Sequence, residues 1–400
     1  MSLDFFIRFQ ALDAWLHQHK ALWRPKPFIS LQLPWETALP ELAQWLRARS
    51  LEQAEAAHNQ PHLLDAPEPF RQLAKQAQSL IELPDLRPPA HSPAPDLLSR
   101  HIPGRKWQQI SYFAETLSRQ WTQPPKYWLD WCAGKGHLGR LLAWQSGQPL
   151  LCLERDPVLN AEGRKLGQQS GIVSQHLDVD VLTATAWQHL RSEHSVVALH
   201  ACGQLHMTLL EQAAQHQCAQ LALSPCCYNR IATDRYQPLS KAAQNAQLGL
   251  NRDDLSLPMQ ESITAGQRVR RLRDQSMAWR LAFDLWQRTA RHTDDYLPTP
   301  SRPESAMQLG IRDFCLSLAA HHSLEMAEPK DWNELEQKGW QRLAQVRNLE
   351  LLRGLFRRPL EVWLLMDRAL YLQEAGYRVQ AGEFCDYQLT PRNLLLLAEK

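Results

Sequence analysis

The fold is decided by the stretch Asp130-Trp131-Cys132-Ala133-Gly134-Lys135-Gly136-His137-Leu138-Gly139. An acidic residue ends a short apolar segment there, a Gly-Lys-Gly turn follows it, and an apolar helical segment begins after the turn. Glycine is needed where a strand turns sharply into a helix, because a Cβ would obstruct the turn or an approaching ligand. The N-terminus of the helix offers free N–H groups and the positive end of its dipole. The stretch therefore predicts a cofactor-binding turn.

Two classes of cofactor fit such a turn. The glycines Gly134, Gly136 and Gly139 match the GxGxxG fingerprint of dinucleotide-binding proteins literally, and proteins that bind S-adenosylmethionine (SAM) use a similar turn. The turn by itself leaves both cofactors open, so the choice between them depends on the strands and helices that surround it.

Short apolar segments alternate with helical patterns around the turn, which predicts a parallel sheet with helices on both faces. The expected strands are residues 127–131, 149–153, 172–177, 196–200 and 219–224.

The end of the chain breaks this rhythm. A helix is expected over 360–374, followed by strands at 377–384 and 394–398. Residues 386–393 are too few for a parallel crossover, so the last two strands should be antiparallel. A dinucleotide dehydrogenase would continue with parallel strands, whereas a closing antiparallel pair favours SAM. We predict an α/β fold with a Rossmann-like, seven-stranded methyltransferase sheet that ends in an antiparallel hairpin.

The sequence outside the sheet is mostly helical and divides the chain into four predicted regions. These are a helical N-terminal region over 1–100 with a proline-rich linker at 84–97, a SAM-binding core over 101–228, a helical, Arg-rich insertion on the substrate side over 229–359, and a helix and hairpin over 360–400 that complete the core.

The ligand of an open α/β sheet binds beyond the carboxyl ends of the strands, so residues at these ends are candidates for cofactor binding. Glu154 ends the second strand and should accept hydrogen bonds from ribose hydroxyls, unless it is only a solvated strand end. Asp178 follows the third strand and is expected to accept from the adenine amino group or to cap a turn. The predicted cofactor residues are Asp130, Cys132, Gly134, Lys135, Gly136, Glu154, Asp178 and His200.

Several segments together resemble a known family. They are residues 130–139, Leu199-His200-Ala201-Cys202-Gly203, Pro225-Cys226-Cys227-Tyr228, and the tail segments 365–368 and 391–393. The chain resembles the methyltransferase-domain proteins that include eukaryotic methyltransferase-like proteins and the glutathione S-transferase C-terminal-domain-containing protein. Its paired cysteines are also similar to those of an RNA 2′-O-methylase family that acts on tRNA. The resemblance covers about 101–228 and 360–400.

The resemblance implies SAM binding through Asp130, Gly134, Gly136 and Glu154. One position departs from the common pattern, because many methyltransferases have glycine where this chain has Cys132. We therefore expect the backbone at Cys132 to avoid positive φ.

The residues after the fourth and fifth strands should line the transferred methyl group. Methyl transfer from a sulfonium is an in-line displacement, so the protein must align the acceptor and, for a weak nucleophile, remove its proton. The candidates are Cys226, Cys227, Tyr228, His200 and Cys202, whose individual roles the sequence leaves open.

Several interpretations of these residues compete. The favoured one is a wall that shapes the acceptor pocket, with Tyr228 stacking on or hydrogen-bonding the acceptor. A cysteine could instead attack a pyrimidine ring, or the thiols could simply be packed in the core. Four nitrogen and sulfur ligands would suit zinc, but adjacent cysteines are awkward ligands for one ion and CxxC spacing is absent. We therefore predict no metal site.

Local basic segments suggest an anionic partner, most simply RNA phosphates, although the net charge is only +2. The Arg-rich segment spans 266–291, and a second cluster precedes the last helix. The proposed RNA-binding residues are Arg268, Arg270, Arg271, Arg273, Arg357 and Arg358. The alternatives are a protein substrate and an ordinary solvated helix face.

The composition is that of a globular protein, with 44% hydrophobic and 22% charged residues. We expect no membrane span and no signal peptide, reduced cysteines and a cytoplasmic location. The predicted function is a SAM-dependent methyltransferase acting on a macromolecular acceptor, preferably RNA (tRNA or rRNA), which is RNA modification. The alternatives are a protein methyltransferase, an NAD-dependent oxidoreductase and a non-catalytic adaptor with a SAM fold.

Overall fold

The computed structural model describes residues 3–90, 92–260, 267–303 and 307–400 and contains two compact units. The first unit comprises Met1–His17, Leu80–Gln260 and Arg358–Lys400, and the second comprises Gln18–Ser79 and Glu261–Arg357. The start of the predicted Arg-rich segment, residue 266, lies outside the described residues.

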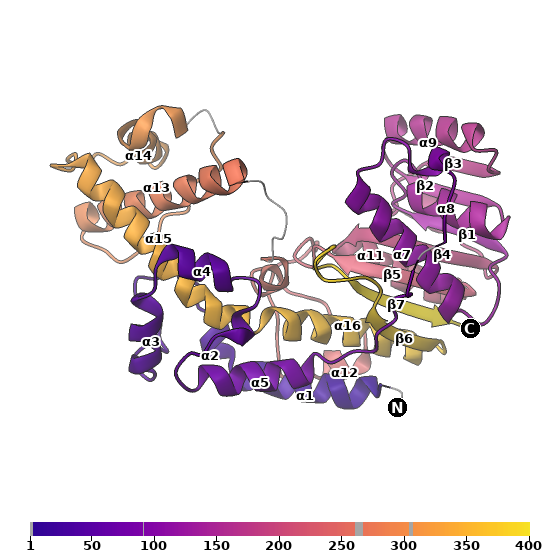
Figure 1. The fold of residues 1–400 in the computed structure, drawn as a ribbon, viewed down its shortest axis with the longest axis horizontal. Coiled ribbons are helices and arrows are strands. Elements are labelled where there is room, and N and C mark those ends of the chain that lie inside the picture. The colour runs from indigo at the N-terminus through magenta and orange to yellow at the C-terminus, as the bar shows by residue number, and fades with distance from the viewer. Residues whose placement is uncertain (1–2, 91, 261–266, 304–306) are drawn as a thin grey trace. The chain divides into compact units, whose positions relative to one another are not determined.

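A seven-stranded sheet forms the centre of the first unit, with the strand order β3-β2-β1-β4-β5-β7-β6 (Figure 1). Strands β1 to β5 pair in parallel, whereas β7 is antiparallel to both β5 and β6. The strands are β1 (Tyr127–Trp131), β2 (Leu150–Glu154), β3 (Ser174–Asp178), β4 (His194–Cys202), β5 (Gln220–Cys226), β6 (Arg378–Glu383) and β7 (Leu394–Glu399). The predicted fold class is confirmed, including the C-terminal antiparallel hairpin.

Helices of the first unit cover this sheet. Its helices are α1 (Phe5–Gln18), α6 (Asp96–Ser99), α7 (Gly104–Gln120), α8 (His137–Ser146), α9 (Pro157–Gln169), α10 (Ala184–Trp187), α11 (Gln204–Gln215), α12 (Lys241–Gln244), the 3₁₀ helix η2 (Asp254–Met259) and α16 (Arg357–Glu374). Helix α8 packs on β1 and β2, and α7 packs on α8. Phe113 of α7, Leu142 of α8 and Trp128 of β1 belong to one buried cluster, which holds α8 against β1.

The second unit is helical. It contains α2 (Lys20–Trp23), α3 (Pro40–Arg47), α4 (Leu51–Ala57), η1 (Pro61–Leu63), α5 (Phe70–Leu80), α13 (Gln267–Arg291), α14 (Gly310–His321) and α15 (Trp332–Gly354). Helix α15 packs against α13, α3 and α4. A Cβ at Gly339 of α15 would lie 2.5 Å from the carbonyl oxygen of Ala278, so glycine permits the close approach of α13 and α15.

The two units do not follow the predicted domain boundaries. Helix α1 belongs to the unit of the sheet, where its Phe9 packs on Trp363 of α16 with ring centroids 5.1 Å apart. Trp363 Nε1 also donates a 3.1 Å hydrogen bond to Asp13 Oδ1. Residues 229–260, expected in the insertion, also lie in the first unit. Contacts between residues so distant in sequence leave no local pattern, so the sequence could not show this division.

The predicted proline-rich linker is partly ordered along the edge of the sheet. Leu86 N–H donates to the carbonyl oxygen of Glu383 at 2.9 Å, and Glu383 N–H donates to that of Pro84 at 3.1 Å. Because β6 is an edge strand, this short bridge covers part of its free backbone.

Among the described residues, no helix is both long enough and apolar enough to cross a membrane.

Candidate active site

The glycine loop between β1 and α8 adopts a left-handed backbone at three positions. The φ angles are 59° at Cys132, 56° at Gly134 and 67° at Gly136. The expectation that Cys132 avoids positive φ is therefore wrong. Ala133 N–H donates to the carbonyl oxygen of Leu153 at 3.0 Å, and this bond holds the turn against the end of β2. A strained non-glycine backbone of this kind is often found at functional sites.

Asp130 supports the loop from inside the protein. Its Oδ2 accepts a 2.9 Å hydrogen bond from the N–H of Gly139, and its side chain is buried. A Cβ at Gly139 would lie 2.6 Å from Leu150 Cδ1, so the helix can lie this close to β2 only with glycine there. Burial raises the pKa of Asp130 to about 7.

One cavity of about 450 Å³ opens beside the glycine loop. We call it the loop cavity; its lining includes Lys106, Asp130, Gly134, His137 and His200. Burial lowers the pKa of His137 to about 3 and that of His200 to about 4, so both rings are neutral at pH 7. His200 Nε2 lies 3.0 Å from Gln109 Oε1. Since an amide oxygen only accepts, the neutral ring donates through Nε2 and keeps Nδ1 as an acceptor.

A second cavity of about 300 Å³, the strand-end cavity, lies at the carboxyl ends of β2, β3 and β4. Cys132 lines both cavities. Glu154 lines the strand-end cavity, where its Oε2 accepts from Gly134 N–H and its Oε1 from Asp156 N–H, each at 3.0 Å. These bonds fix the carboxylate at the end of β2, the position expected for binding ribose hydroxyls; that role stays a prediction.

The acidic residue that the structure brings to the strand-end cavity after β3 is Asp180, whereas the sequence suggested Asp178. Asp178 Oδ1 instead accepts a 2.7 Å hydrogen bond from Asn160 Nδ2 and lies 3.7 Å from Arg164 Nη1. Val179 N–H donates to the carbonyl oxygen of Glu154, which carries the strand pairing one residue past the end of β3. The aspartate that contacts the cavity is therefore two residues further along the chain than predicted. The only sign of this in the sequence is that a second aspartate follows Asp178 closely.

Lys135 also has a structural contact. It lines the loop cavity and forms an ion pair with Glu162 of α9, which ties the glycine loop to the next helix.

Three of the five catalytic candidates meet at the ends of β4 and β5. The sulfur atoms of Cys202, Cys226 and Cys227 all lie within 4.8 Å of one another, and the first two are 3.5 Å apart. Hydrogen bonding with Cys226, chiefly, lowers the pKa of Cys202 to about 6. That bond is also the largest of the effects that raise the pKa of Cys226. Cys202 lines the strand-end cavity, so the cluster adjoins the cofactor region.

Tyr228 departs from one of its two predicted roles, which is to stack on the acceptor. Its ring is 2% exposed, packs edge-on against His206 at 5.9 Å and lies 5.2 Å from the guanidinium carbon of Arg368. An acceptor could not stack on a ring enclosed in this way, so the prediction of stacking is wrong for this conformation. The positive φ of Cys227, 46°, turns the chain inward at this point, and no pattern in the sequence indicated that turn.

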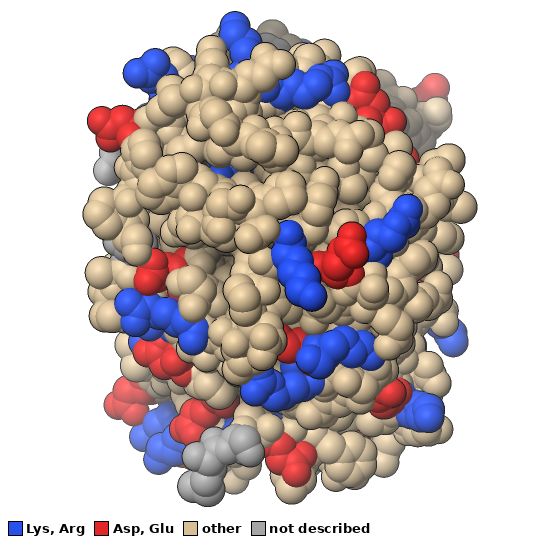
Figure 2. Space-filling view, turned by 90° about the vertical axis from the view of Figure 1, so that its right-hand side faces the viewer, with Lys and Arg blue, Asp and Glu red and all other residues tan. Residues whose placement is uncertain are grey.

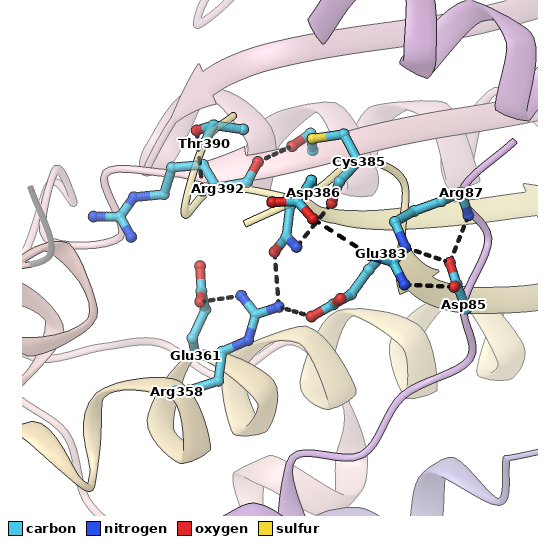
Figure 3. Close-up of polar contacts among 11 residues, drawn as sticks. Asp85, Arg87, Arg358, Glu361, Glu383, Cys385, Asp386, Thr390 and Arg392 are labelled. Carbon is cyan, nitrogen blue, oxygen red and sulfur yellow. Dashed lines mark hydrogen bonds and ion pairs between the residues drawn. The ribbon is translucent and has the colours of Figure 1, made fainter. Parts of the chain in front are cut away.

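The predicted RNA-binding arginines differ in their environments. Arg357 is 3% exposed and donates to the carbonyl oxygen of His58. Arg358 donates to Glu361, Glu383 and Asn393 at 2.8, 2.6 and 2.8 Å (Figure 3). Both are therefore committed to internal contacts, which corrects their predicted role in RNA binding.

The arginines at the start of α13 are more open. Arg268, Arg270 and Arg271 are exposed, whereas Arg273 is half-buried and lies 3.6 Å from Asp274. Figure 2 shows the side of the molecule that is on the right in Figure 1, and basic and acidic side chains are interspersed there.

Arg392 is a further candidate for the site, and in the sequence it is only one residue of the tail segment 391–393 that resembles the family. Figure 3 shows its guanidinium group extending away from the ion pairs of Arg358. Its Nη1 is buried and has no hydrogen-bond partner among the described residues. Its charge contributes, after larger effects, to the pKa values of His200 and Tyr228, so Arg392 lies near both. Ser224 Oγ donates to its carbonyl oxygen at 3.3 Å, which attaches this loop to the end of β5.

Residues 105–234 match a family model described as a methyltransferase domain. Together with the strand order, this match confirms the predicted SAM-dependent methyltransferase domain, with S-adenosylmethionine as its cofactor. No curated protein matches the chain.

Several solved structures are similar to parts of the chain. One, from work on the conversion of a disulfide bond into a thioacetal group during echinomycin biosynthesis, has 16% identity over 27% of this chain and 48% of that one, with a TM-score of 0.23. Geranyl diphosphate methyltransferase in complex with GPP and sinefungin has 10% identity over 46% and 64%, with a TM-score of 0.26. An O-methyltransferase family protein from Burkholderia thailandensis has 8% identity over 97% and 94%, with a TM-score of 0.29. The chain spans less than two thirds of the first two, and such low scores support no assignment of substrate.

Proposed function

We propose that the protein transfers a methyl group from SAM to an RNA acceptor. The methyltransferase domain over residues 105–234 supports the transfer itself. The resemblance of the paired cysteines to those of a tRNA 2′-O-methylase family supports RNA, and the wider resemblance is to eukaryotic methyltransferase-like proteins and the glutathione S-transferase C-terminal-domain-containing protein.

The cofactor side of the reaction follows from the two cavities that share Cys132. Glu154 and Asp180 in the strand-end cavity offer carboxylates to ribose hydroxyls and to the adenine amino group. The glycine loop admits the rest of the cofactor, since space is open where a Cβ of Gly134 would stand. SAM, when bound, supplies an activated methyl group.

The acceptor side involves His200 and Arg392. His200 is neutral at pH 7 and keeps Nδ1 as a hydrogen-bond acceptor in the loop cavity. It can therefore orient an acceptor hydroxyl or N–H group without adding a positive charge beside the sulfonium.

The single observation that carries the choice of RNA is the environment of Arg392. A buried guanidinium nitrogen without a partner among the described residues is costly, and a bound anion would remove this cost. Arginine binds phosphate oxygens through two parallel N–H groups. The anion we propose for this position is a backbone phosphate next to the methylated nucleotide. The exposed Arg268, Arg270 and Arg271 of α13 add a sequence-independent attraction to phosphates.

The test is transfer of labelled methyl groups from SAM to RNA and protein fractions of cells that lack this protein. We expect ribonuclease-sensitive label in RNA. Arg392→Ala should reduce the transfer at least tenfold, and Arg392→Lys should retain part of it at low salt. The control is Arg100→Ala, which removes an exposed arginine of the same unit.

Other outcomes would overturn the proposal in distinct ways. Label confined to the protein fraction would make the chain a protein methyltransferase. Binding of S-adenosylhomocysteine without transfer to either fraction would make it an adaptor. NAD binding in calorimetry without S-adenosylhomocysteine binding would make it an oxidoreductase.

A further inference from the structure

The cluster formed by Cys202, Cys226 and Cys227, the thiol cluster, has the geometry of a metal site. All eight cysteines of the chain are free thiols, and these three converge from two neighbouring strands. Cys202 ends β4 and Cys226 ends β5, where the two residues are paired across the parallel strands after a local irregularity between Leu199 and Cys202.

The backbone explains how adjacent cysteines reach the same point. Consecutive side chains of an extended strand point to opposite faces of the sheet, so Cys226 and Cys227 should diverge. Cys227 instead has a φ of 46°, in the left-handed region that non-glycine residues seldom adopt. This conformation brings its sulfur within 4.8 Å of both other sulfur atoms. The objection that adjacent cysteines cannot serve one ion does not apply to such a backbone.

The distances suit zinc. A zinc–sulfur bond of about 2.3 Å in a tetrahedral site places two sulfur ligands about 3.8 Å apart. The sulfur atoms of Cys202 and Cys226 are 3.5 Å apart, and no pair in the cluster exceeds 4.8 Å. Small side-chain rotations would bring all three to the bonding geometry.

The surroundings hold this arrangement in place. A Cβ at Gly203 would lie 2.1 Å from the carbonyl oxygen of Arg230, so only glycine lets the turn after β4 meet the loop after β5. Arg230 N–H donates to the carbonyl oxygen of Cys227 at 3.0 Å, and Gln204 N–H donates to that of Arg230 at 2.7 Å. These bonds tie together the two segments that supply the sulfur atoms.

Charge and access are also suitable. Three thiolates around Zn²⁺ leave one net negative charge, and Arg230 lines the same cavity as Cys202. Cys226 is 5% exposed, whereas Cys202 and Cys227 are half-buried. An ion can therefore enter through the strand-end cavity. His200, the fourth ligand considered from the sequence, lies outside the cluster and contacts Gln109.

We propose that Cys202, Cys226 and Cys227 form a three-thiolate zinc site that opens to the strand-end cavity. Water would complete the four ligands, as in zinc sites that keep one open position. Binding releases the thiol protons to solvent and changes no oxidation state. The proposal is independent of whether RNA is the acceptor, because its test measures the metal.

The experiment is elemental analysis of the full chain, purified under reducing conditions without chelator. We expect about one zinc ion per chain. The zinc content should be lower in Cys202→Ala, Cys226→Ala and Cys227→Ala, because the loss of a ligand should weaken zinc binding by at least about tenfold. Cys218→Ala is the matched control, because it removes a buried thiol of the same unit outside the cluster. Circular dichroism checks that each variant is folded.

A second measurement avoids any dependence on the folding of the variants. Wild-type protein stripped of metal should bind Co²⁺ and show thiolate-to-cobalt charge-transfer absorption, which added Zn²⁺ should abolish. The proposal fails if reduced wild-type protein holds no zinc and shows no such absorption, or if folded cluster variants retain as much metal as the control. It also fails if peptide mass analysis of freshly isolated protein finds a disulfide within the cluster and no metal.

Discussion

Gly139 N–H donates a 2.9 Å hydrogen bond to Asp130 Oδ2, and this bond joins the end of β1 to the first turn of α8. The two residues are also packed together, because a Cβ at Gly139 would lie 3.0 Å from the same oxygen. This contact joins the two ends of the glycine loop, so the shape of the loop should be sensitive to either residue.

Gly139→Ala should destabilise the protein and weaken cofactor binding. The added Cβ would stand 2.6 Å from Leu150 Cδ1 and 3.0 Å from Asp130 Oδ2, so α8 would have to move. We expect a loss of about 1–3 kcal/mol in the free energy of unfolding, measured with urea, and a weaker affinity for S-adenosylhomocysteine in calorimetry. Gly104→Ala is the control, because no atom lies within 4 Å of its added Cβ. Equal effects of the two substitutions would contradict this account.

Asp130→Asn should change how stability depends on pH. Burial raises the pKa of Asp130 from 3.8 to about 7, so the folded state binds its proton more tightly than the unfolded state. The stability from that proton is fully present below about pH 3.8 and is lost as the pH rises through about 7. In the ligand-free protein the loss amounts to at most about 4 kcal/mol.

An asparagine side chain does not titrate, so the unfolding free energy of Asp130→Asn should decline less than that of the wild type between about pH 4 and 7. Urea unfolding at several pH values gives the comparison. The control is Asp156→Asn. Asp156 is exposed, and an asparagine at this position can still cap α9. Parallel pH profiles for the wild type and Asp130→Asn would refute the prediction.

Asp180→Asn and Asp178→Asn should separate the cavity residue from its neighbour. Asp180 lines the strand-end cavity, whereas Asp178 is bonded to Asn160. We expect Asp180→Asn to weaken S-adenosylhomocysteine binding by about tenfold, the effect of losing one charged hydrogen-bond acceptor. Asp178→Asn should leave the affinity nearly unchanged in the same calorimetric titration. The reverse order would restore the role that was predicted for Asp178.

Arg358→Ala should lower stability rather than act on RNA directly. The substitution removes a cationic partner of Glu361, which is 2% exposed, and of Glu383. Removing one partner of a buried ion pair costs about 3 kcal/mol, which a thermal melt would detect. The free energy of unfolding of the combined variant R268A/R270A/R271A should lie within about 0.5 kcal/mol of the wild-type value, since the substituted side chains are exposed. It should instead reduce the salt dependence of RNA binding.

The sequence predicted the elements of the sheet well, because strand and turn signals are local. Strand β1 has the predicted bounds, 127–131, and the glycine loop and the antiparallel hairpin lie where they were expected. At the candidate site, the errors lie at side chains beyond the strand ends. There the φ angles of single residues such as Cys132 and Cys227 decide which way a side chain points. Such angles result from packing across the fold and leave no periodic pattern in the sequence.

The candidate site shows the same limit. The sequence correctly predicted that Cys202, Cys226 and Cys227 lie close together, since the carboxyl ends of neighbouring parallel strands lie at the same edge of the sheet. It could not show that Tyr228 turns inward. It also could not show that Arg358 of α16 reaches Glu383 and Asn393 of the C-terminal hairpin, because these contacts leave no local pattern.

The bridge between Pro84–Leu86 and Glu383 has a consequence for solubility. The outer side of β6 would otherwise present unpaired N–H and C=O groups on which a strand from another molecule could assemble. Proline cannot donate a backbone hydrogen bond, so a proline-rich segment covers such an edge without extending it into a new template. We therefore expect residues 84–86 to limit self-association at this end of β6. Chains shortened past this segment should aggregate even where the sheet itself still folds.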